Sequence, residues 1–122
     1  MSEMNPDSIL QSVKKLLGPA YDDNAFDLDI IVQINTAFSI LTDIGVGPKT
    51  GFAIADDTAV WNDFINVEED PIFNKVKTFV QLKAKLYFDP PTNSSLLEAM
   101  KESIKELEWR LNVNGDEAGM DS

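Results

Sequence analysis

Apolar and polar residues alternate along most of the chain with the period of an α-helix, and glycines and prolines interrupt the pattern at intervals. The first periodic segment starts with Asn5 as N-cap and Pro6 at the first helical position, and it ends at Gly18. The pattern predicts a surface helix that buries one side in a core. Its apolar side consists of Ile9, Val13, Leu16 and Leu17, and its polar side of Gln11, Lys14 and Lys15.

The second segment is the most apolar of the chain. Asp27 is expected to cap a helix over residues 28–44 that stops at Gly45. Because the apolar side is so broad, this helix is expected to contact several neighbours. At about 100° per residue, that side holds Ile30, Ile31, Ile34, Ala37, Phe38, Leu41 and Ile44, whereas Leu28, Val32 and Ile40 lie outside it.

Residues 45–56 contain three glycines and a proline, so no helix is expected to run through them. The alternation of Phe52 and Ile54 allows a short strand. Two interpretations remain open for this loop: it projects and grips a neighbouring molecule, or it folds back on its own core. Under the first, the candidate contact residues are Val46, Lys49, Phe52 and Ile54.

A short helix capped by Asp57 or Thr58 is expected next, with Val60, Trp61, Phe64 and Ile65 as its apolar residues. Asp70 and Pro71 then start a long helix that ends at Phe88, before Asp89-Pro90-Pro91. Its apolar arc is wide, so this helix is predicted to be central. Lys83 lies near the middle of that arc and is expected to meet a carboxylate or to extend its stem to water.

The last helix, capped by Thr92 or Asn93, is expected to run to about Leu111. Its other face carries glutamates and basic residues at ion-pair spacing. Trp109 falls among those charges, so it either contacts a partner or is an ordinary exposed or intrachain residue. The apolar stripe comprises Leu96, Leu97, Met100, Ile104, Leu107 and Leu111, and the candidate interface comprises Trp109, Arg110, Leu111, Asn112 and Val113.

Together these segments predict an all-α fold, a small bundle of four to five helices with one irregular Gly/Pro loop. A single helical domain over residues 1–111 accounts for the periodic part of the chain. Residues 112–122 are polar and acidic, and they are expected to form a flexible tail that is disordered until a partner binds it.

The composition excludes several classes of catalytic and metal-binding site. The chain has neither cysteine nor histidine, which removes disulfides, thiol nucleophiles, Cys/His metal sites and His-based triads. The acids Asp22, Asp23, Asp27 and Asp29 lack the spacing of a calcium loop. No catalytic, cofactor-binding or metal site is therefore expected, and no apolar run is long enough for a membrane span.

The net charge of −11 argues against sequence-specific DNA binding, because such a surface repels phosphate. Two interpretations remain open. The acidic surface can line a route for DNA without retaining it, or it serves solubility alone.

Several segments resemble the head-tail connector (head-completion, or adaptor) proteins of tailed phages. The most specific are the "FDPPT" turn at 88–92 and the "ELEWRL" helix end at 106–111, with Val76 to Val80 before them. Further similarity lies in residues 9–18, 34–38, 45–47 and 61–64.

The resemblance implies a subunit that forms a ring, commonly dodecameric, below the portal protein. Such a ring extends the DNA channel and offers a platform for the next connector or tail protein. It would be found in the virion neck, and in the host cytoplasm during assembly. The alternative is a monomeric or dimeric helical adaptor or regulatory domain that binds a partner protein.

Overall fold

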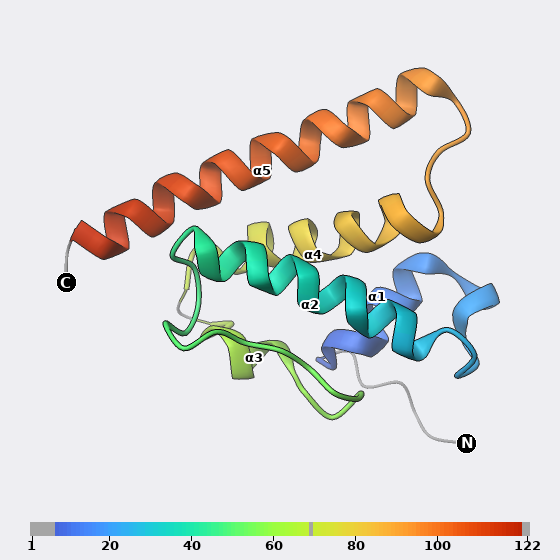
Figure 1. Cartoon of the computed structure of the whole chain (residues 1–122), viewed down its shortest axis with the longest axis horizontal. Coiled ribbons are helices and arrows are strands. Elements are labelled where there is room, and N and C mark those ends of the chain that lie inside the picture. Colours follow the sequence, from blue (N-terminus) through green and yellow to red (C-terminus); the bar gives the residue numbers. More distant parts are fainter. Residues whose placement is uncertain (1–6, 69, 121–122) are drawn as a thin grey trace.

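The computed structural model describes residues 7–68 and 70–120, with side chains as far as Val113, and it confirms the all-α prediction (Figure 1). Within those ranges the only strand-type pairing is an isolated bridge between Ser8 and Val60. The helices are α1 (Ile9–Leu17), the 3-10 turn η1 (Pro19–Tyr21), α2 (Asp27–Asp43), α3 (Trp61–Phe64), α4 (Phe73–Phe88) and α5 (Ser94–Met120).

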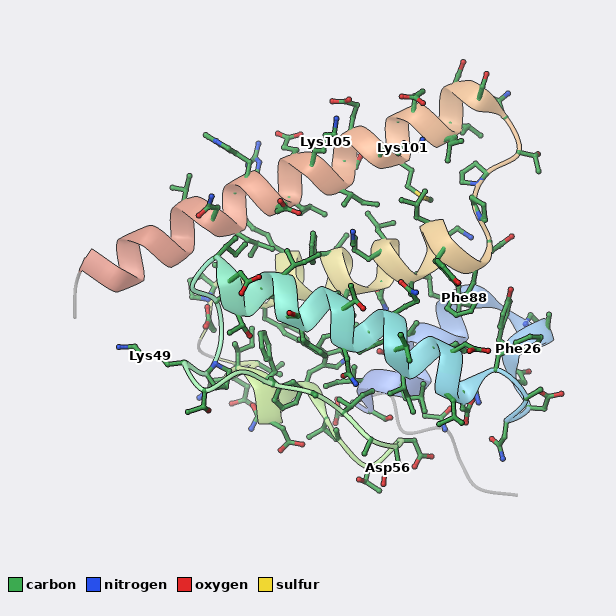
Figure 2. The ribbon with its side chains drawn as sticks, viewed as in Figure 1. Phe26, Lys49, Asp56, Phe88, Lys101 and Lys105 are labelled. Atoms are coloured by element: carbon green, nitrogen blue, oxygen red, sulfur yellow. The ribbon has the colours of Figure 1, made fainter. Side chains whose placement is uncertain are left out.

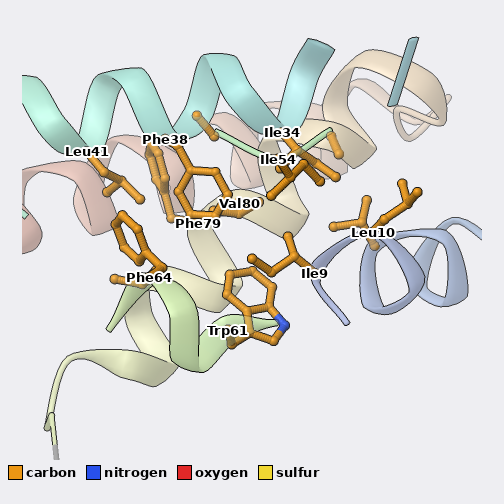
Figure 3. Close-up of a cluster of buried hydrophobic side chains, with 14 of the residues drawn as sticks. Ile9, Leu10, Ile34, Phe38, Leu41, Ile54, Trp61, Phe64, Phe79 and Val80 are labelled. Carbon is orange, nitrogen blue, oxygen red and sulfur yellow. The ribbon is translucent and has the colours of Figure 1, made fainter. Parts of the chain in front are cut away.

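The two central helices are α2 and α4, which pack against each other along most of their length. Helix α1 covers one end of this pair, α5 lies along α4, and α3 closes the remaining side (Figures 1 and 2). Six of the seven residues expected on the apolar side of α2 are buried, all except Ile44. Figure 3 shows them meeting α1, α3 and α4 in one cluster, where burial of each large side chain contributes about 1.5 to 3 kcal/mol.

The start of α1 differs from the expected one. Ser8 is the N-cap, because its Oγ accepts a hydrogen bond from the Gln11 backbone N–H at 3.2 Å. The same hydroxyl donates to the Asp57 carbonyl at 2.8 Å, which ties the helix start to the chain before α3. Asn5 and Pro6, the expected start signals, lie outside the described residues. The predicted end at Gly18 is confirmed, since its φ of 105° breaks the helix there.

The prediction that Lys14 faces solvent was wrong. Lys14 is only 2% exposed, while Leu16, expected in the core, is 40% exposed. The Lys14 ammonium lies 2.8 Å from the Asp27 carboxylate and directs its hydrogen bond to the Asp23 carbonyl at 3.0 Å. The first residue of α2 supplies the negative charge: Asp27, the expected cap of this helix, pairs with Lys14, and Phe26 takes the N-cap position without a side-chain cap hydrogen bond.

Lys83 is half-buried, and no ion pair of this lysine is found over the described ranges. The buried and paired lysine of this fold is therefore Lys14. The spacing along one helix could not distinguish the two, because the carboxylate that neutralises Lys14 comes from another part of the chain.

The Gly/Pro loop folds back on its own core and forms no strand. Phe52 packs its ring against Phe38 and Phe64, at centroid distances of 4.9 and 5.2 Å. Asn35 of α2 binds the loop through two hydrogen bonds. Its Oδ1 accepts from the Ile54 N–H at 2.7 Å, and its Nδ2 donates to the Ile54 carbonyl at 3.0 Å. These two bonds satisfy backbone groups that a strand partner would otherwise take.

Helix α4 starts later than expected. Ile72 takes its N-cap position without a side-chain cap hydrogen bond, while Asp70, the expected cap, accepts a hydrogen bond from the Ile72 N–H in the turn before the helix. Helix α5 does start on a side-chain cap, because Asn93, one of the two expected caps, accepts hydrogen bonds from the backbone N–H groups of Ser95 and Leu96. Helix α4 ends at Phe88 as predicted.

Helix α5 continues to Met120, which corrects the end expected near Leu111. Residues 112–120, expected in a disordered tail, continue the helix instead. No proline interrupts this stretch, and its two glycines, Gly115 and Gly119, each cost a helix only about 1 kcal/mol.

Candidate subunit and partner surfaces

Two of the clefts formed by the described residues are relevant to binding. One, of about 520 Å³, lies between α3 and the start of α4 and is lined by Asp7, Val60, Trp61, Asn62, Asn66, Val67, Glu68, Phe73 and Lys77. The other, of about 440 Å³, runs between α4 and α5 and is lined by Lys75, Thr78, Leu82, Ser103, Glu106, Leu107 and Arg110.

Neither cleft resembles a catalytic site. Over the described part of the chain, no group of three or more acidic residues lies close enough together to hold a metal ion. None of the helices found there combines the length and the apolarity that crossing a membrane requires.

Three of the four loop candidates are not available for binding. Val46 and Ile54 are 3% and 5% exposed, and Phe52 is half-buried between two aromatic rings. Their apolar side chains turn inward because Gly45, Gly47 and Gly51 all take positive φ, which bends the chain back over the core. Only Lys49 is exposed, at the tip of the loop (Figure 2).

The candidates on α5 divide between two faces. Leu111 is fully buried and holds the helix to the bundle, whereas Trp109 is 66% exposed and Val113 is 38% exposed. Arg110 donates from Nε and Nη2 to the same oxygen of Glu106, Oε1, at 3.2 and 2.8 Å, and Asn112 is exposed. Trp109 and Val113 are four residues apart, so they lie next to each other on the outer face of α5.

A surface that sequence reasoning did not select lies at the other end of the molecule from Lys49 (Figure 2). There Phe26 packs against Tyr21, which in turn packs against Phe88 and donates a hydrogen bond to its carbonyl. Phe26 and Tyr87 are 43% and 64% exposed. No periodic pattern indicated this aromatic cluster, because its members come from a turn and from a helix end.

The outer side of α2 is also apolar. Leu28 is 78% exposed and Val32 is 58% exposed. Here a signal was present in the sequence, since both residues fall outside the apolar arc that faces the core.

Charge is distributed unevenly over the fold. Residues 20–72 hold eleven carboxylates and one cation, Lys49, which gives a net charge of −10. Residues 73–113, which form α4 and the described side chains of α5, hold seven cations and five carboxylates, a net charge of +2. The negative charge is therefore concentrated on residues 20–72.

One carboxylate in this acidic part has a shifted pKa. Hydrogen bonds from the Thr58 hydroxyl and backbone N–H lower the pKa of Asp56 from its ordinary value of 3.8.

Comparison with known families gives one match. A model of the family described as "Phage connector protein" matches residues 9–118. A search of curated proteins and a search of solved structures each returned no match. The match extends from the first residue of α1 into α5 and includes the "FDPPT" turn between them. Because it takes in the whole helical bundle rather than one short motif, the chain belongs to the phage connector protein family.

Proposed function

We propose that this phage connector protein is the subunit of a ring that joins the head of a tailed phage to its tail. The ring would sit below the portal protein, extend the DNA channel and provide the docking platform for the next connector or tail protein. The observation that carries the proposal is the family match over residues 9–118. The subunit would be located in the virion neck, after assembly in the host cytoplasm.

The exposed side chains of α5 support a binding role. A tryptophan that is 66% exposed on a helix otherwise lined by charges is unusual, and tryptophan is enriched among the residues that dominate binding energy. Trp109 and Val113, with Asn112 and Arg110 beside them, are proposed to contact the portal or the next connector. Lys49 at the loop tip is a second candidate contact.

The net charge supports a passage for DNA. Each phosphate that a protein neutralises adds salt-dependent affinity, and affinity opposes movement along a channel. A subunit with a net charge of −11 makes few such contacts. Its proposed work is thus mechanical, and no residue is assigned a catalytic role.

The test is assembly on the portal. Native mass spectrometry of the purified chain, alone and with portal protein, is expected to show ring-sized species in the mixture. A chain that stays monomeric in both samples would contradict the proposal. A ring in the mixture and a monomer alone would still support it, since a template can be required for closure.

The exposed Trp109 also favours a second candidate function, a helical adaptor that binds a single partner as a monomer or dimer. The same measurement separates the two, because an adaptor gives a small complex of fixed size with no ring-sized species.

A further inference from the structure

Two surfaces of this subunit carry apolar side chains beside charges of opposite sign. One is the α2 ridge, defined as the outer side of α2 with Leu28 and Val32. The other is the α4–α5 groove, the cleft of about 440 Å³ between those helices.

The α2 ridge is apolar with a negative border. Leu28 and Val32 are four residues apart, and Thr36 and Ser39 continue the same side with small exposed polar groups. Three aspartates and no basic residue lie in α2, and Asp29 is exposed next to the ridge. Two neighbouring apolar side chains that are more than half exposed favour a partner that removes them from water.

The α4–α5 groove has the opposite charge. Leu82 and Leu107 are half-buried in it, and Lys75 and Arg110 lie along it, one from each helix. Its single carboxylate, Glu106, already pairs with Arg110 at 2.8 Å. Helix α4 contributes four lysines and no acidic residue to this half of the molecule.

The ridge of a chain cannot reach the groove of the same chain. Helix α2 packs against α4 through the side that carries Ile30, Ile34 and Phe38, and the ridge lies on the opposite side. Helices commonly pack with the side chains of one fitting between those of its neighbours. A ridge from another copy can therefore pack between α4 and α5 in this way.

We propose that the α2 ridge of one copy docks into the α4–α5 groove of a second copy. This assignment rests on the proposed ring, whose head-to-tail contacts require two different surfaces on each subunit. Leu28 and Val32 would cover Leu82 and Leu107, while Asp29 would face the Lys75 and Arg110 edges. Trp109, on a different side of α5 from the groove, stays free for the portal or the next connector.

Cysteine cross-linking tests the contact directly, because the chain has no cysteine of its own. The double variant Val32→Cys with Thr78→Cys carries one thiol on the ridge and one in the groove. Treated with a short bis-maleimide in the presence of portal protein, it is expected to give a ladder of covalent oligomers on a denaturing gel. Each single variant is expected to stay monomeric, since a head-to-tail contact never brings two ridges or two grooves together.

The matched control is Glu68→Cys with Thr78→Cys. Glu68 is exposed in the same acidic half as the ridge but lies outside it, so this variant tests whether general charge attraction is enough. It is expected to give no ladder. A ladder from the control as strong as that from the ridge variant would overturn the assignment, and so would a dimer from Val32→Cys alone.

Charge exchange gives an independent readout. Asp29→Lys and Arg110→Glu are each expected to lower the yield of ring-sized species by about tenfold or more, because each places like charges at the contact. The two substitutions combined in one chain are expected to restore most of the yield. Both side chains are exposed, so each single variant is expected to fold, and circular dichroism of the isolated variants checks this.

The outcomes separate this inference from the function on which it rests. Ring-sized species in native mass spectrometry without a ridge-to-groove ladder would leave the ring in place and refute these two surfaces. No ring-sized species under any condition, with or without portal, would refute both.

Discussion

The loop at 45–56 and the outer face of α5 differ in whether their apolar side chains are buried or exposed. Both carry large apolar side chains outside the expected core stripes, and both were candidates for contact with another molecule. In the loop, Val46 and Ile54 are buried in the subunit's own core. On α5, Trp109 stays 66% exposed.

The difference shows what fixes the direction of a side chain. On a helix, Leu111 and Trp109 are about 200° apart by the helical repeat alone, so if one is buried the other is exposed. In a loop no such rule applies, and the direction is set by positive-φ glycines and by the Asn35 hydrogen bonds. The exposure of an apolar residue could therefore be predicted on a regular helix of this fold but not in the loop.

The largest expected effect comes from the buried member of the α5 pair. Leu111→Ala should lower the free energy of unfolding by about 2 to 5 kcal/mol, because Leu111 is fully buried and its loss leaves a cavity. Urea unfolding followed by circular dichroism measures this. A loss below about 1 kcal/mol would mean that α5 is not held to the bundle at this residue.

The loop provides the next largest effect. An alanine Cβ at Gly47 would lie 2.4 Å from the Phe64 ring, and Phe64 is itself buried, so the ring cannot move away. Gly47→Ala should cost about 2 to 4 kcal/mol from overpacking and positive φ together. The matched control is Gly51→Ala, which has a similar φ of 91° but no atom within 4 Å of the added Cβ. It should cost only about 1 to 2 kcal/mol. Equal losses in the two variants would show that the loop does not press on Phe64.

The exposed member of the α5 pair should give the reverse result. Trp109→Ala is expected to change the free energy of unfolding by less than about 0.5 kcal/mol. Assembly with the portal should weaken by about 2 kcal/mol or more, if Trp109 dominates that contact. Thermal unfolding and the yield of ring-sized species are compared on the same preparation. A large fall in melting temperature would place Trp109 in the core and remove the contrast with the loop.

The smallest effect concerns Asp56, which lies just outside the buried part of the loop. Its pKa is lowered in the folded state, so the stability that it contributes is present above its ordinary value of 3.8 and is lost as the pH falls through the lowered folded value. Asp56→Asn should remove this part of the acid sensitivity and leave stability at neutral pH slightly lower. Melting temperatures measured from neutral pH down into the acid range would show it. Parallel pH curves for the two proteins would contradict the assignment.

Much of the fold could be predicted from local pattern. The ends of α1 at Gly18 and of α4 at Phe88 follow from residues that break a helix, and the buried side of α2 follows from its period. These features depend on neighbours within one or two turns of the chain. Residues such as Lys14 do not, because the carboxylate that permits its burial belongs to the following helix.

The candidate site was predicted in part for the same reason. Trp109 was found because a regular helix defines its outer face, and Leu28 and Val32 could have been chosen by the same argument. The cluster around Phe26 and Tyr87 could not, since it forms only when a turn and a helix end from distant parts of the chain meet. Which of these surfaces binds which partner could not be predicted, because it also depends on the surface of the partner. A single chain shows only its own half of the contact.

The uneven charge of this fold has one more consequence. Residues 20–72 carry a net charge of −10, whereas residues 73–122 carry −1, so nearly all of the excess negative charge lies on the first of these segments. In the proposed ring, an open string of subunits would leave one strongly acidic end and one nearly neutral end. Closing the ring would bring these two ends together, and salt would screen the interaction beyond about 8 Å.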